Sequence, residues 1–279
     1  MGYEVAGVID ALGAGVAGLQ VGQRVLALVR FGGHADTVCA PAERVLPMPD
    51  DLSFIDGAAL PVNYLTAYHM LFRVANLRPG ARVLVHMAAG GVGLAVLQLC
   101  RTVPDVVTFG TASAAKHVVL REQGCTHPID YRTEDYAARV RELTGGEGVD
   151  LVLDPLGGRD CKRGLRLLRP VGQLIAYGFA NLSAGERRSV RRLVGQLAGV
   201  PLLTPYGLAN RNQTVSGVNL GHLWGRSDLL REELVALLDL WRAGAVRPRV
   251  DGVYPFEEAA AAHRRIGERR NIGKVILVP

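Results

Sequence analysis

Residues 83–93 constrain the fold most strongly, because an apolar strand there passes into an apolar helix through a glycine turn. Against the spacing G-x-G-x-x-G, the three positions hold Ala88, Gly90 and Gly93, so an alanine replaces the first glycine. Gly90 would let the backbone approach a pyrophosphate, and Gly93 would let the helix pack closely on the strand. The helix N-terminus would supply N–H groups to the phosphates. The turn therefore predicts a dinucleotide site, with a plain structural turn as the alternative.

The order of elements around this turn favours the dinucleotide site. Strands are expected at 82–86, 106–110, 128–131, 149–154 and 173–179, and helices at 92–101, 115–123, 133–143 and 159–168. This alternation predicts an α/β fold with a parallel, doubly wound sheet. A strand at 214–220 and a helix at 228–243 are expected to extend the same sheet.

The two ends of the chain have a different pattern. The first 60 residues predict short strands separated by glycine turns, at 5–9, 24–29 and 34–45, which suit a small barrel or sandwich. The tail predicts a strand, a helix and a strand, at 248–253, 256–266 and 274–278. Between these regions, Ser53 is the expected N-cap of a helical stretch that Pro61 interrupts.

The end of the second strand of the predicted sheet indicates which dinucleotide is bound. An NAD site places Asp or Glu there, about 20 residues after the glycines, to bind the ribose 2′-hydroxyl. The chain instead has Thr111, Ser113 and Lys116, with no acid between 109 and 116. Hydroxyl donors and a compact positive charge suit a 2′-phosphate, so the sequence favours NADPH. The alternative is that Lys116 is an ordinary solvated helix residue.

The charge balance bears on partners. The net charge is +6, yet only three of the 32 basic residues are lysines, at positions 116, 162 and 274. Excess arginine can mark a nucleic-acid or membrane surface. The abundance of alanine and glycine instead indicates codon bias from a GC-rich genome, so we expect no nucleic-acid partner. The scarcity of lysine makes its few positions informative.

Neither targeting nor cysteine chemistry is indicated. No apolar run reaches the length of a spanning helix, and the first residues do not resemble a signal peptide, so a cytoplasmic protein is expected. The four cysteines are scattered without C-x2-C spacing, which argues against a structural zinc site. Reduced thiols are therefore expected.

Taken together, these motifs resemble the medium-chain dehydrogenase/reductase superfamily, in its zinc-independent quinone oxidoreductase branch. The resemblance is closest to the vesicle amine transport protein family and covers nearly the whole chain. Besides the glycine turn, its motifs are, in order, 62–68 (VNYLTAY), 76–80 (NLRPG), 109–113 (FGTAS), 126–131 (THPIDY), 154–158 (DPLGG), 177–181 (YGFAN) and 271–275 (NIGKV).

The resemblance implies two domains with NADPH between them. A GroES-like β-barrel catalytic domain would comprise residues 1–60 and 245–279, and a Rossmann domain residues 61–244. Carried over by residue, Gly91, Val92 and Gly93 would face the pyrophosphate, beside Gly90 of the motif. The residues that would line the 2′-phosphate are Thr111, Ser113, Lys116 and Tyr131. Gly178 and Phe179 would lie beside the nicotinamide ribose, and Asn271 and Lys274 would close the cleft from the tail. A homodimer joined through the edge strand 214–220 is also implied.

The resemblance also bears on metal and on catalysis. Zinc-dependent members carry Gly-His-Glu where this chain has Gly-Tyr-Glu at positions 2–4, so no metal site is expected. Family members begin with further strands, so the barrel is expected to lack its first strands. The catalytic proton donor is therefore unassigned. Asn63, Tyr64 and Tyr68 are the nearest polar candidates, and core packing explains them equally well.

Residues 180–203 contain an arginine-rich amphipathic helix pattern. Arginines at 187, 188, 191 and 192 alternate with an apolar face, which suits a solvated helix covering a cleft or, less favoured, a membrane surface.

The leading functional hypothesis is an NADPH-dependent, zinc-independent oxidoreductase that reduces a small electrophile, either a quinone or an activated alkene such as an enone. The alternatives are a nucleotide-binding regulatory or membrane-associated protein with little catalysis, and an inactive truncated paralogue.

Overall fold

The computed structural model describes residues 2–183 and 199–279. The chain divides into two compact units, one formed by Met1–Tyr68 with Leu220–Pro279 and the other by His69–Asn219. The sequence placed these boundaries differently, after residues 60 and 244. The arginine-rich stretch around 187–192 lies outside the described residues.

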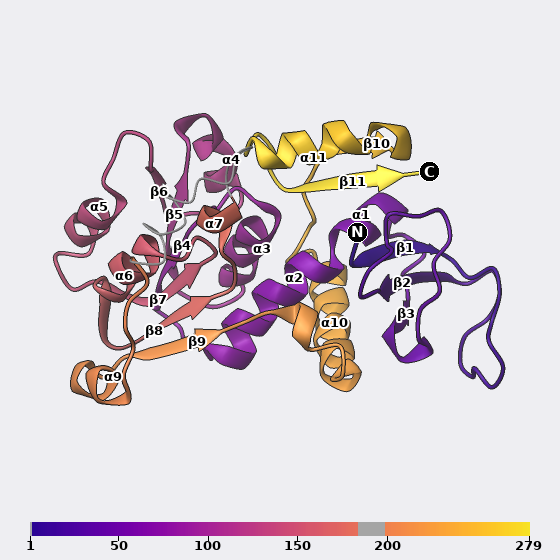
Figure 1. Cartoon of the computed structure of the whole chain (residues 1–279), viewed down its shortest axis with the longest axis horizontal. Helices are drawn as coiled ribbons and strands as arrows, with labels where there is room; N and C mark the ends of the chain where they lie inside the picture. The colour runs from indigo at the N-terminus through magenta and orange to yellow at the C-terminus, as the bar shows by residue number, and fades with distance from the viewer. Residues whose placement is uncertain (1, 184–198) are drawn as a thin grey trace. The chain divides into compact units, whose positions relative to one another are not determined.

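The unit from His69 to Asn219 is built on one six-stranded sheet (Figure 1). Its strands run in the order β6-β5-β4-β7-β8-β9, and every neighbouring pair is parallel. The bounds are β4 (Arg82–Val85), β5 (Val107–Ala112), β6 (His127–Asp130), β7 (Val149–Asp154), β8 (Leu168–Ala176) and β9 (Thr214–Gly217). This is the doubly wound order of the Rossmann fold, whose direction reverses between β4 and β7. The predicted α/β fold class is confirmed.

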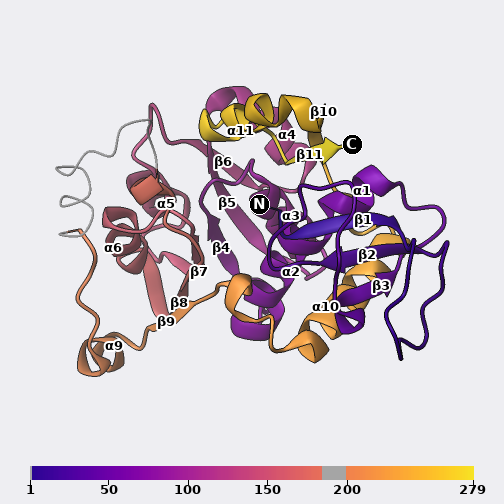
Figure 2. The ribbon, with the colours of Figure 1, turned by 45° about the vertical axis from the view of Figure 1, so that its right-hand side comes forward.

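Helices cover both faces of this sheet (Figure 2). On one face, α5 and α6 pack against a core that includes Leu84, Phe109 and Val152. The α-helices of the unit are α3 (Gly91–Cys100), α4 (His117–Glu122), α5 (Tyr136–Leu143), α6 (Arg159–Leu165), α7 (Ala180–Ser183) and α9 (Pro205–Arg211), with a π-helical turn η2 (His69–Val74) and a 3-10 turn η3 (Ala114–Lys116). Because α3 follows β4 and α6 follows β7, their N-termini both lie at the carboxyl edge of the sheet.

The other unit combines the two ends of the chain. Its sheets are an antiparallel one in the order β1-β2-β3 and a parallel pair of β10 and β11. Its elements are β1 (Glu4–Val8), β2 (Arg24–Leu28), η1 (Ala42–Arg44), β3 (Val45–Pro47), α1 (Phe54–Ala59), α2 (Pro61–Tyr68), η4 (Leu220–His222), α10 (Ser227–Arg242), β10 (Val250–Pro255), η5 (Phe256–Glu258), α11 (Ala259–Gly267) and β11 (Lys274–Val278). The predicted return to strand, helix and strand in the tail is confirmed.

Local signals account for the start of α1 and its separation from α2. Ser53 caps α1, since its hydroxyl oxygen accepts the backbone N–H of Asp56 at 3.0 Å. Pro61 begins α2, where its missing N–H costs little and its ring ends the preceding helix. Both expectations about this stretch are confirmed.

Two predictions about elements are wrong. The strand expected at 34–45 is absent; only β3 forms, after the 3-10 turn η1 that follows Pro41, which cannot donate to a strand ladder. The helix α10 was expected to cover the six-stranded sheet, but it packs on α2 in the other unit. Its apolar stripe, spaced at three and four residues, is buried there.

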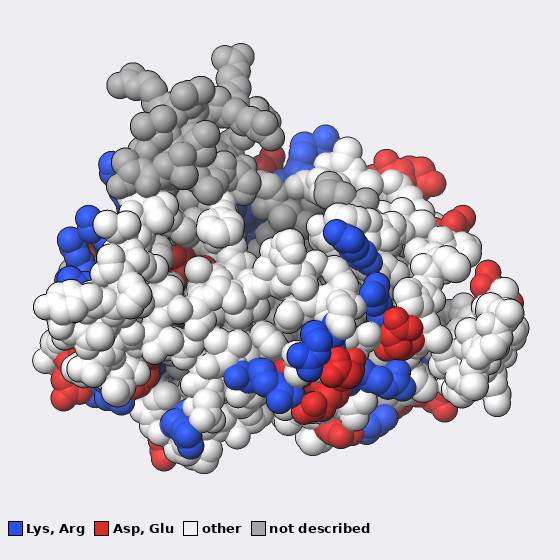
Figure 3. All heavy atoms as spheres, turned by 60° about the horizontal axis from the view of Figure 1, so that its bottom comes forward, with Lys and Arg blue, Asp and Glu red and all other residues white. Residues whose placement is uncertain are grey.

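Some of the arginine charge is balanced by neighbouring carboxylates. On the face drawn in Figure 3, basic and acidic side chains lie beside one another. Several arginines pair with nearby carboxylates, including Arg163 with Asp135 at 2.5 Å and Arg169 with Asp150 at 2.5 Å. This intermingling differs from the single-sign stripe that a polyanion needs.

Candidate functional site

The glycine turn leaves the N-terminus of α3 open to an anion. Gly90 is the N-cap and has no side chain to cap the helix, and the first turn of α3 contains no acidic residue. The N–H groups of Gly91, Val92 and Gly93 have no acceptor four residues earlier within the helix. Open amides and the positive end of the helix dipole suit a pyrophosphate. These residues therefore fit the phosphate-binding role that the sequence predicted.

The turn also explains why an alanine is accepted at its first glycine position. The residue with a left-handed backbone is Met87, whose φ is 52°, so Ala88 is spared that conformation. The carbonyl of Met87 then accepts the N–H of Gly90 at 2.9 Å and closes the turn. A Cβ on Gly93 would lie 2.6 Å from the backbone of Ala88, so glycine is required where α3 meets the turn.

Three of the four predicted 2′-phosphate residues lie near the carboxyl ends of β5 and β6. Ala112 pairs with Asp130, so Ser113 and Tyr131 follow a neighbouring pair of residues. The Ser113 hydroxyl makes no capping bond to η3, and Lys116 ends that turn. Tyr131 is exposed. A hydroxyl, an ammonium and a phenol around one edge fit a phosphate.

Thr111, the fourth predicted residue, points into the protein instead. It is buried, and its Oγ1 lies 3.2 Å from Nδ1 of His86. Its carbonyl accepts the N–H of Ala88 at 3.1 Å. The carbonyl of Thr111 thus links the end of β5 to the glycine turn, while its side chain contacts His86 in the interior. The sequence could not distinguish an inward from an outward hydroxyl at the end of a strand.

The predicted nicotinamide-side turn follows β8. The N–H of Tyr177 donates to the Asp154 carbonyl at 3.0 Å, so the end of β8 is held beside the end of β7. A Cβ on Gly178 would lie 3.0 Å from the Pro155 carbonyl, which requires the close approach that glycine allows. Phe179 is exposed beyond this turn. Its position beside the turn after β7 is compatible with the predicted role next to a ribose.

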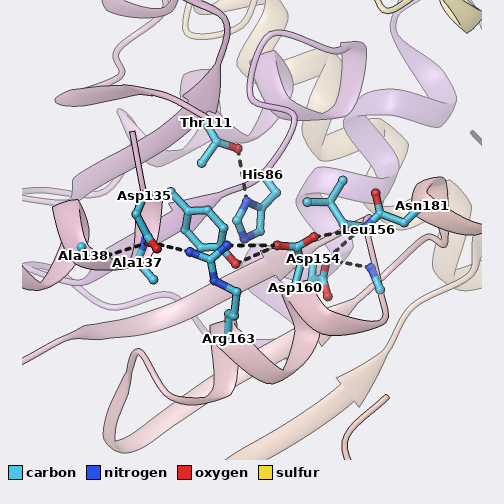
Figure 4. A network of polar contacts seen from close by, with 12 residues as sticks. His86, Thr111, Asp135, Ala137, Ala138, Asp154, Leu156, Asp160, Arg163 and Asn181 are labelled. Carbon is cyan, nitrogen blue, oxygen red and sulfur yellow. Dashed lines mark hydrogen bonds and ion pairs between the residues drawn. The ribbon is translucent and has the colours of Figure 1, made fainter. Parts of the chain in front are cut away.

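Buried polar residues that the sequence did not indicate lie beneath this edge (Figure 4). His86 is 1% exposed and Asp154 is 0% exposed. Burial lowers the pKa of His86 to about 4, and burial raises the pKa of Asp154. The Oδ1 of Asp154 accepts the N–H groups of Leu156 and Gly157, at 2.7 and 3.1 Å, and so shapes the turn before α6. The sequence signals were a histidine within the 83–93 stretch and the aspartate that begins the motif at 154–158.

Asn271 and Lys274, the two predicted residues from the tail, lie in the other unit. The ammonium of Lys274 donates to Oε1 of Glu4. The second carboxylate oxygen of Glu4 accepts the N–H of Val62 at 2.6 Å. The amide of Asn271 donates to the Gly273 carbonyl at 2.9 Å. These contacts join β1, α2 and β11, and the role of both residues at a cofactor stays a prediction.

Of the polar residues of α2, Tyr64 is buried in the core, whereas Asn63 and Tyr68 are half-buried. Tyr64 is 2% exposed, and its hydroxyl donates to the Arg247 carbonyl at 3.1 Å. This supports packing over proton donation for Tyr64. Among residues 2–183 and 199–279, no group of three or more His, Cys, Asp or Glu side chains is arranged to hold a metal ion.

Comparison with known proteins places the chain in a family. Residues 123–277 match the family model described as zinc-binding dehydrogenase, and residues 1–50 match the alcohol dehydrogenase GroES-like domain. The synaptic vesicle membrane protein VAT-1 homolog of Rattus norvegicus is 48% identical over 278 residues, which cover 100% of this chain and 69% of that protein. A 2-haloacrylate reductase of a Burkholderia species is 34% identical over 282 residues, covering 100% and 80%.

A solved structure extends the likeness. Escherichia coli quinone oxidoreductase complexed with NADPH matches with a TM-score of 0.85 and 26% identity, over 100% of this chain and 82% of that one. Fold, glycine turn and matches together define a medium-chain dehydrogenase/reductase, an oxidoreductase of the quinone oxidoreductase and enoyl reductase type. Within that superfamily, the chain belongs to the VAT-1 family.

The expectation of a cytoplasmic protein is wrong. The relatives from Rattus norvegicus and Tetronarce californica are named synaptic vesicle membrane proteins, which points to a membrane-associated family. Among the described residues, no helix combines the length and the apolar character needed to cross a bilayer.

Proposed function

We propose that the chain binds NADPH along the carboxyl edge of its six-stranded sheet and reduces a quinone or an activated alkene. The observation that carries this proposal is the open, acid-free N-terminus of α3 behind Gly90. The absence of any acid between residues 109 and 116, where Ser113 and Lys116 stand, supports NADPH over NADH. The NADPH complex of the similar quinone oxidoreductase adds support.

Each part of the cofactor has candidate residues. The backbone from Gly90 to Gly93 would hold the pyrophosphate, and Ser113, Lys116 and Tyr131 the 2′-phosphate. The Gly178–Phe179 turn would border the nicotinamide ribose. Asn271 and Lys274 are assigned on the family resemblance alone. The chemistry that NADPH supplies when bound is hydride transfer, for which the protein provides orientation and electrostatics.

The reaction is proposed to be independent of zinc. Tyr3 stands where zinc-dependent members of the superfamily carry histidine. Turnover should therefore survive dialysis against a chelator, with no zinc retained by elemental analysis. Activity that falls on chelation and returns with zinc would refute this part of the proposal.

The binding proposal is tested by titrating NADPH and NADH while following nicotinamide fluorescence. The wild-type chain should prefer NADPH, and Lys116→Ala should lose most of that preference, because the ammonium is proposed to contact the 2′-phosphate, which NADH lacks. Lys162→Ala is the matched control, since Lys162 is exposed on α6. Equal affinity for both cofactors, or an unchanged preference in Lys116→Ala, would contradict the proposal.

Turnover separates the enzyme from a regulatory nucleotide-binding protein. NADPH oxidation should accelerate when a simple quinone or an enone is added to the purified chain. Binding of NADPH without turnover of either acceptor class would favour the regulatory alternative.

The resemblance also suggests a homodimer joined through β9, which is the last strand in the sheet order. Light scattering on the purified chain should give twice the monomer mass. A monomer at all concentrations would contradict this assignment.

A second candidate function is association with a membrane surface, favoured by the vesicle membrane names of the relatives. The chain should sediment with anionic vesicles, and salt should release it. Replacing Arg187, Arg188, Arg191 and Arg192 with Gln should abolish sedimentation. Absence of sedimentation at low salt would remove this candidate.

A further inference from the structure

Side chains form a connected series of contacts beneath the carboxyl edge of the six-stranded sheet. The register pairs Val85 with Gly110, so His86 and Thr111 follow paired residues on β4 and β5. Both side chains are buried, at 1% and 3% exposure, and they face each other at 3.2 Å. Buried polar groups at this depth need partners, so their contacts are specific constraints on the structure.

This series of side-chain contacts continues from His86 toward α6. The His86 ring meets the ring of Tyr136 edge-on, with centroids 4.7 Å apart and planes at 82°. The Tyr136 hydroxyl donates to Oδ1 of Asp160 at 3.0 Å. The other oxygen of Asp160 accepts the side-chain amide of Asn181 at 3.0 Å. Figure 4 shows His86, Asp160 and Asn181, which come from separate elements.

The half-buried carboxylate of Asp160 has a counter-charge. Arg163 lies one turn after Asp160 on α6, with 4.0 Å between its Nη1 and Oδ1 of Asp160. Its guanidinium also stacks over the Tyr136 ring, 4.1 Å from the centroid. Asp135 accepts a bond from Arg163 on its outer side. Tyr136 is therefore held between a histidine, a carboxylate and a guanidinium.

The two ends of this series of side-chain contacts lie next to the two ends of the proposed cofactor site. Thr111 precedes the loop that carries Ser113 and Lys116, on the adenosine side. Asn181 follows the Gly178–Phe179 turn, on the nicotinamide side. His86 lies between them and begins the glycine turn, which Thr111 also holds through its carbonyl and the N–H of Ala88. The glycine turn, the loop after β5 and the turn after β8 are thus each backed by one of these residues, whereas the loop after β6, which carries Tyr131, is not.

We propose that these residues, Thr111, His86, Tyr136, Asp160 and Asn181, form an edge network that positions three of the proposed cofactor-binding turns, namely the glycine turn, the loop after β5 and the turn after β8. The network keeps these three turns in register without touching the cofactor. The inference rests on the proposed NADPH function. A ligand that spans all three turns needs their relative positions fixed, whereas a ligand that occupies one turn does not. Outer residues that orient contact residues commonly control affinity in this way.

The decisive variant is Tyr136→Phe, which removes one oxygen from the middle of the network and leaves the ring against His86. NADPH affinity should fall by up to roughly tenfold, because binding must then order turns that the lost bond no longer holds, and the energy of one bond to a charged group sets the upper limit. Affinity for adenosine 2′,5′-bisphosphate, which covers only the adenosine end, should change by less than about twofold. Both are measured by calorimetric titration of the whole chain.

Threonines on β5 provide a matched control. Thr108 and Thr111 are both buried on this strand, but Thr108 bonds the Gly124 carbonyl and Thr126, away from the carboxyl edge. Thr111→Val should weaken both ligands, and Thr111→Ser should restore them by returning the hydroxyl. Thr108→Val should lower thermal stability while leaving both affinities unchanged.

Two outcomes would overturn the inference. Tyr136→Phe could bind both ligands like the wild-type chain, or it could lose both equally, and either result would make the network ordinary core packing. If Tyr136→Phe does not fold, Asn181→Leu cuts the nicotinamide end, with the same selective loss of NADPH expected and the same two contrary results. A wild-type chain that binds neither ligand would refute the proposed function itself.

Discussion

Gly93 is the residue at which the glycine turn has the least room. A Cβ there would lie 2.6 Å from Cα and the carbonyl of Ala88 and from the Met87 carbonyl, all of them backbone atoms that cannot swing aside. We expect Gly93→Ala to lower the free energy of unfolding by about 1–3 kcal/mol, because α3 must move away from the turn. NADPH affinity should fall as well. Chemical denaturation and fluorescence titration measure the two effects.

Gly267 gives the matched control for this substitution. It ends α11, and a Cβ there would meet no atom within 4 Å. Gly267→Ala should therefore leave stability unchanged or slightly raised, because alanine is the better helix former. Equal destabilisation by the two substitutions would contradict the packing argument for Gly93.

His86 makes folding sensitive to acid. Its pKa in the folded chain is about 4, below its ordinary value of 6.5, because burial disfavours the charged ring. Between these values the unfolded chain takes up a proton that the folded chain does not. The stabilisation is therefore complete above pH 6.5 and is lost as the pH falls toward 4, by an amount on the order of 3 kcal/mol.

Comparing the wild-type chain with His86→Gln isolates the contribution of His86 to the pH dependence of the free energy of unfolding. Glutamine keeps a hydrogen-bonding group but does not titrate, so the variant should lose less stability between about pH 7 and about pH 4.5. The pKa of Asp154 is raised, which has the opposite sign, but that carboxyl is common to both proteins. Urea unfolding at the two pH values measures the difference. Identical losses in both proteins would show that His86 does not titrate as described.

At the scale of elements, Glu4 joins β1, α2 and β11. Its carboxylate accepts both the Lys274 ammonium and the N–H of Val62, with side-chain exposures of only 8% for Glu4 and 22% for Lys274. Glu4→Gln would leave a partly buried ammonium without its counter-charge. We expect a loss of about 1–3 kcal/mol in the free energy of unfolding, measured by denaturant titration.

Lys162→Met tests whether removing a charge is itself destabilising. Lys162 is exposed on α6, so this variant should unfold like the wild-type chain. If Glu4→Gln also unfolded like the wild-type chain, Glu4 would contribute nothing to the packing of these three elements.

At the scale of the whole molecule, the two compact units should respond differently to NADPH. In hydrogen exchange, added NADPH should slow the amides of residues 90–94 and of the loops after β5, β6 and β8, because ligand bound to the native state opposes local opening. If Asn271 and Lys274 also contact the cofactor, amides 271–275 in the other unit should slow too. Unchanged exchange at 271–275 would remove these two residues from the cofactor site.

Much of the fold was predictable from local sequence. The alternation of strands and helices, the glycine turn, the cap at Ser53 and the break at Pro61 depend on residues within one turn or one strand of each other. The identity of the proposed cofactor also rested on adjacent residues, from Gly90 to Gly93 and from Ser113 to Lys116. Such signals do not depend on residues that are distant in the sequence.

Other features depended on partners that lie far apart in the sequence. Lys274 meets Glu4 across 270 positions, and His86 meets Thr111 across 25. The sequence assigned Thr111 to the 2′-phosphate and Lys274 to the tail that closes the cofactor cleft. It gave no sign of their partners in the fold, because a lysine or a hydroxyl carries no local indication of the group that it will meet. For the same reason, the apolar stripe of α10 predicted a helix but not that α2 would cover it.

The sequence by itself thus determined the α/β class, the parallel and doubly wound character of the sheet and the turn proposed to take a pyrophosphate. Only the tertiary structure decided which polar side chains face inward and join into the edge network. The physical reason is that backbone conformation and phosphate-binding amides are set by neighbouring residues. The direction of a buried polar side chain is set by whichever distant group can satisfy its hydrogen bonds.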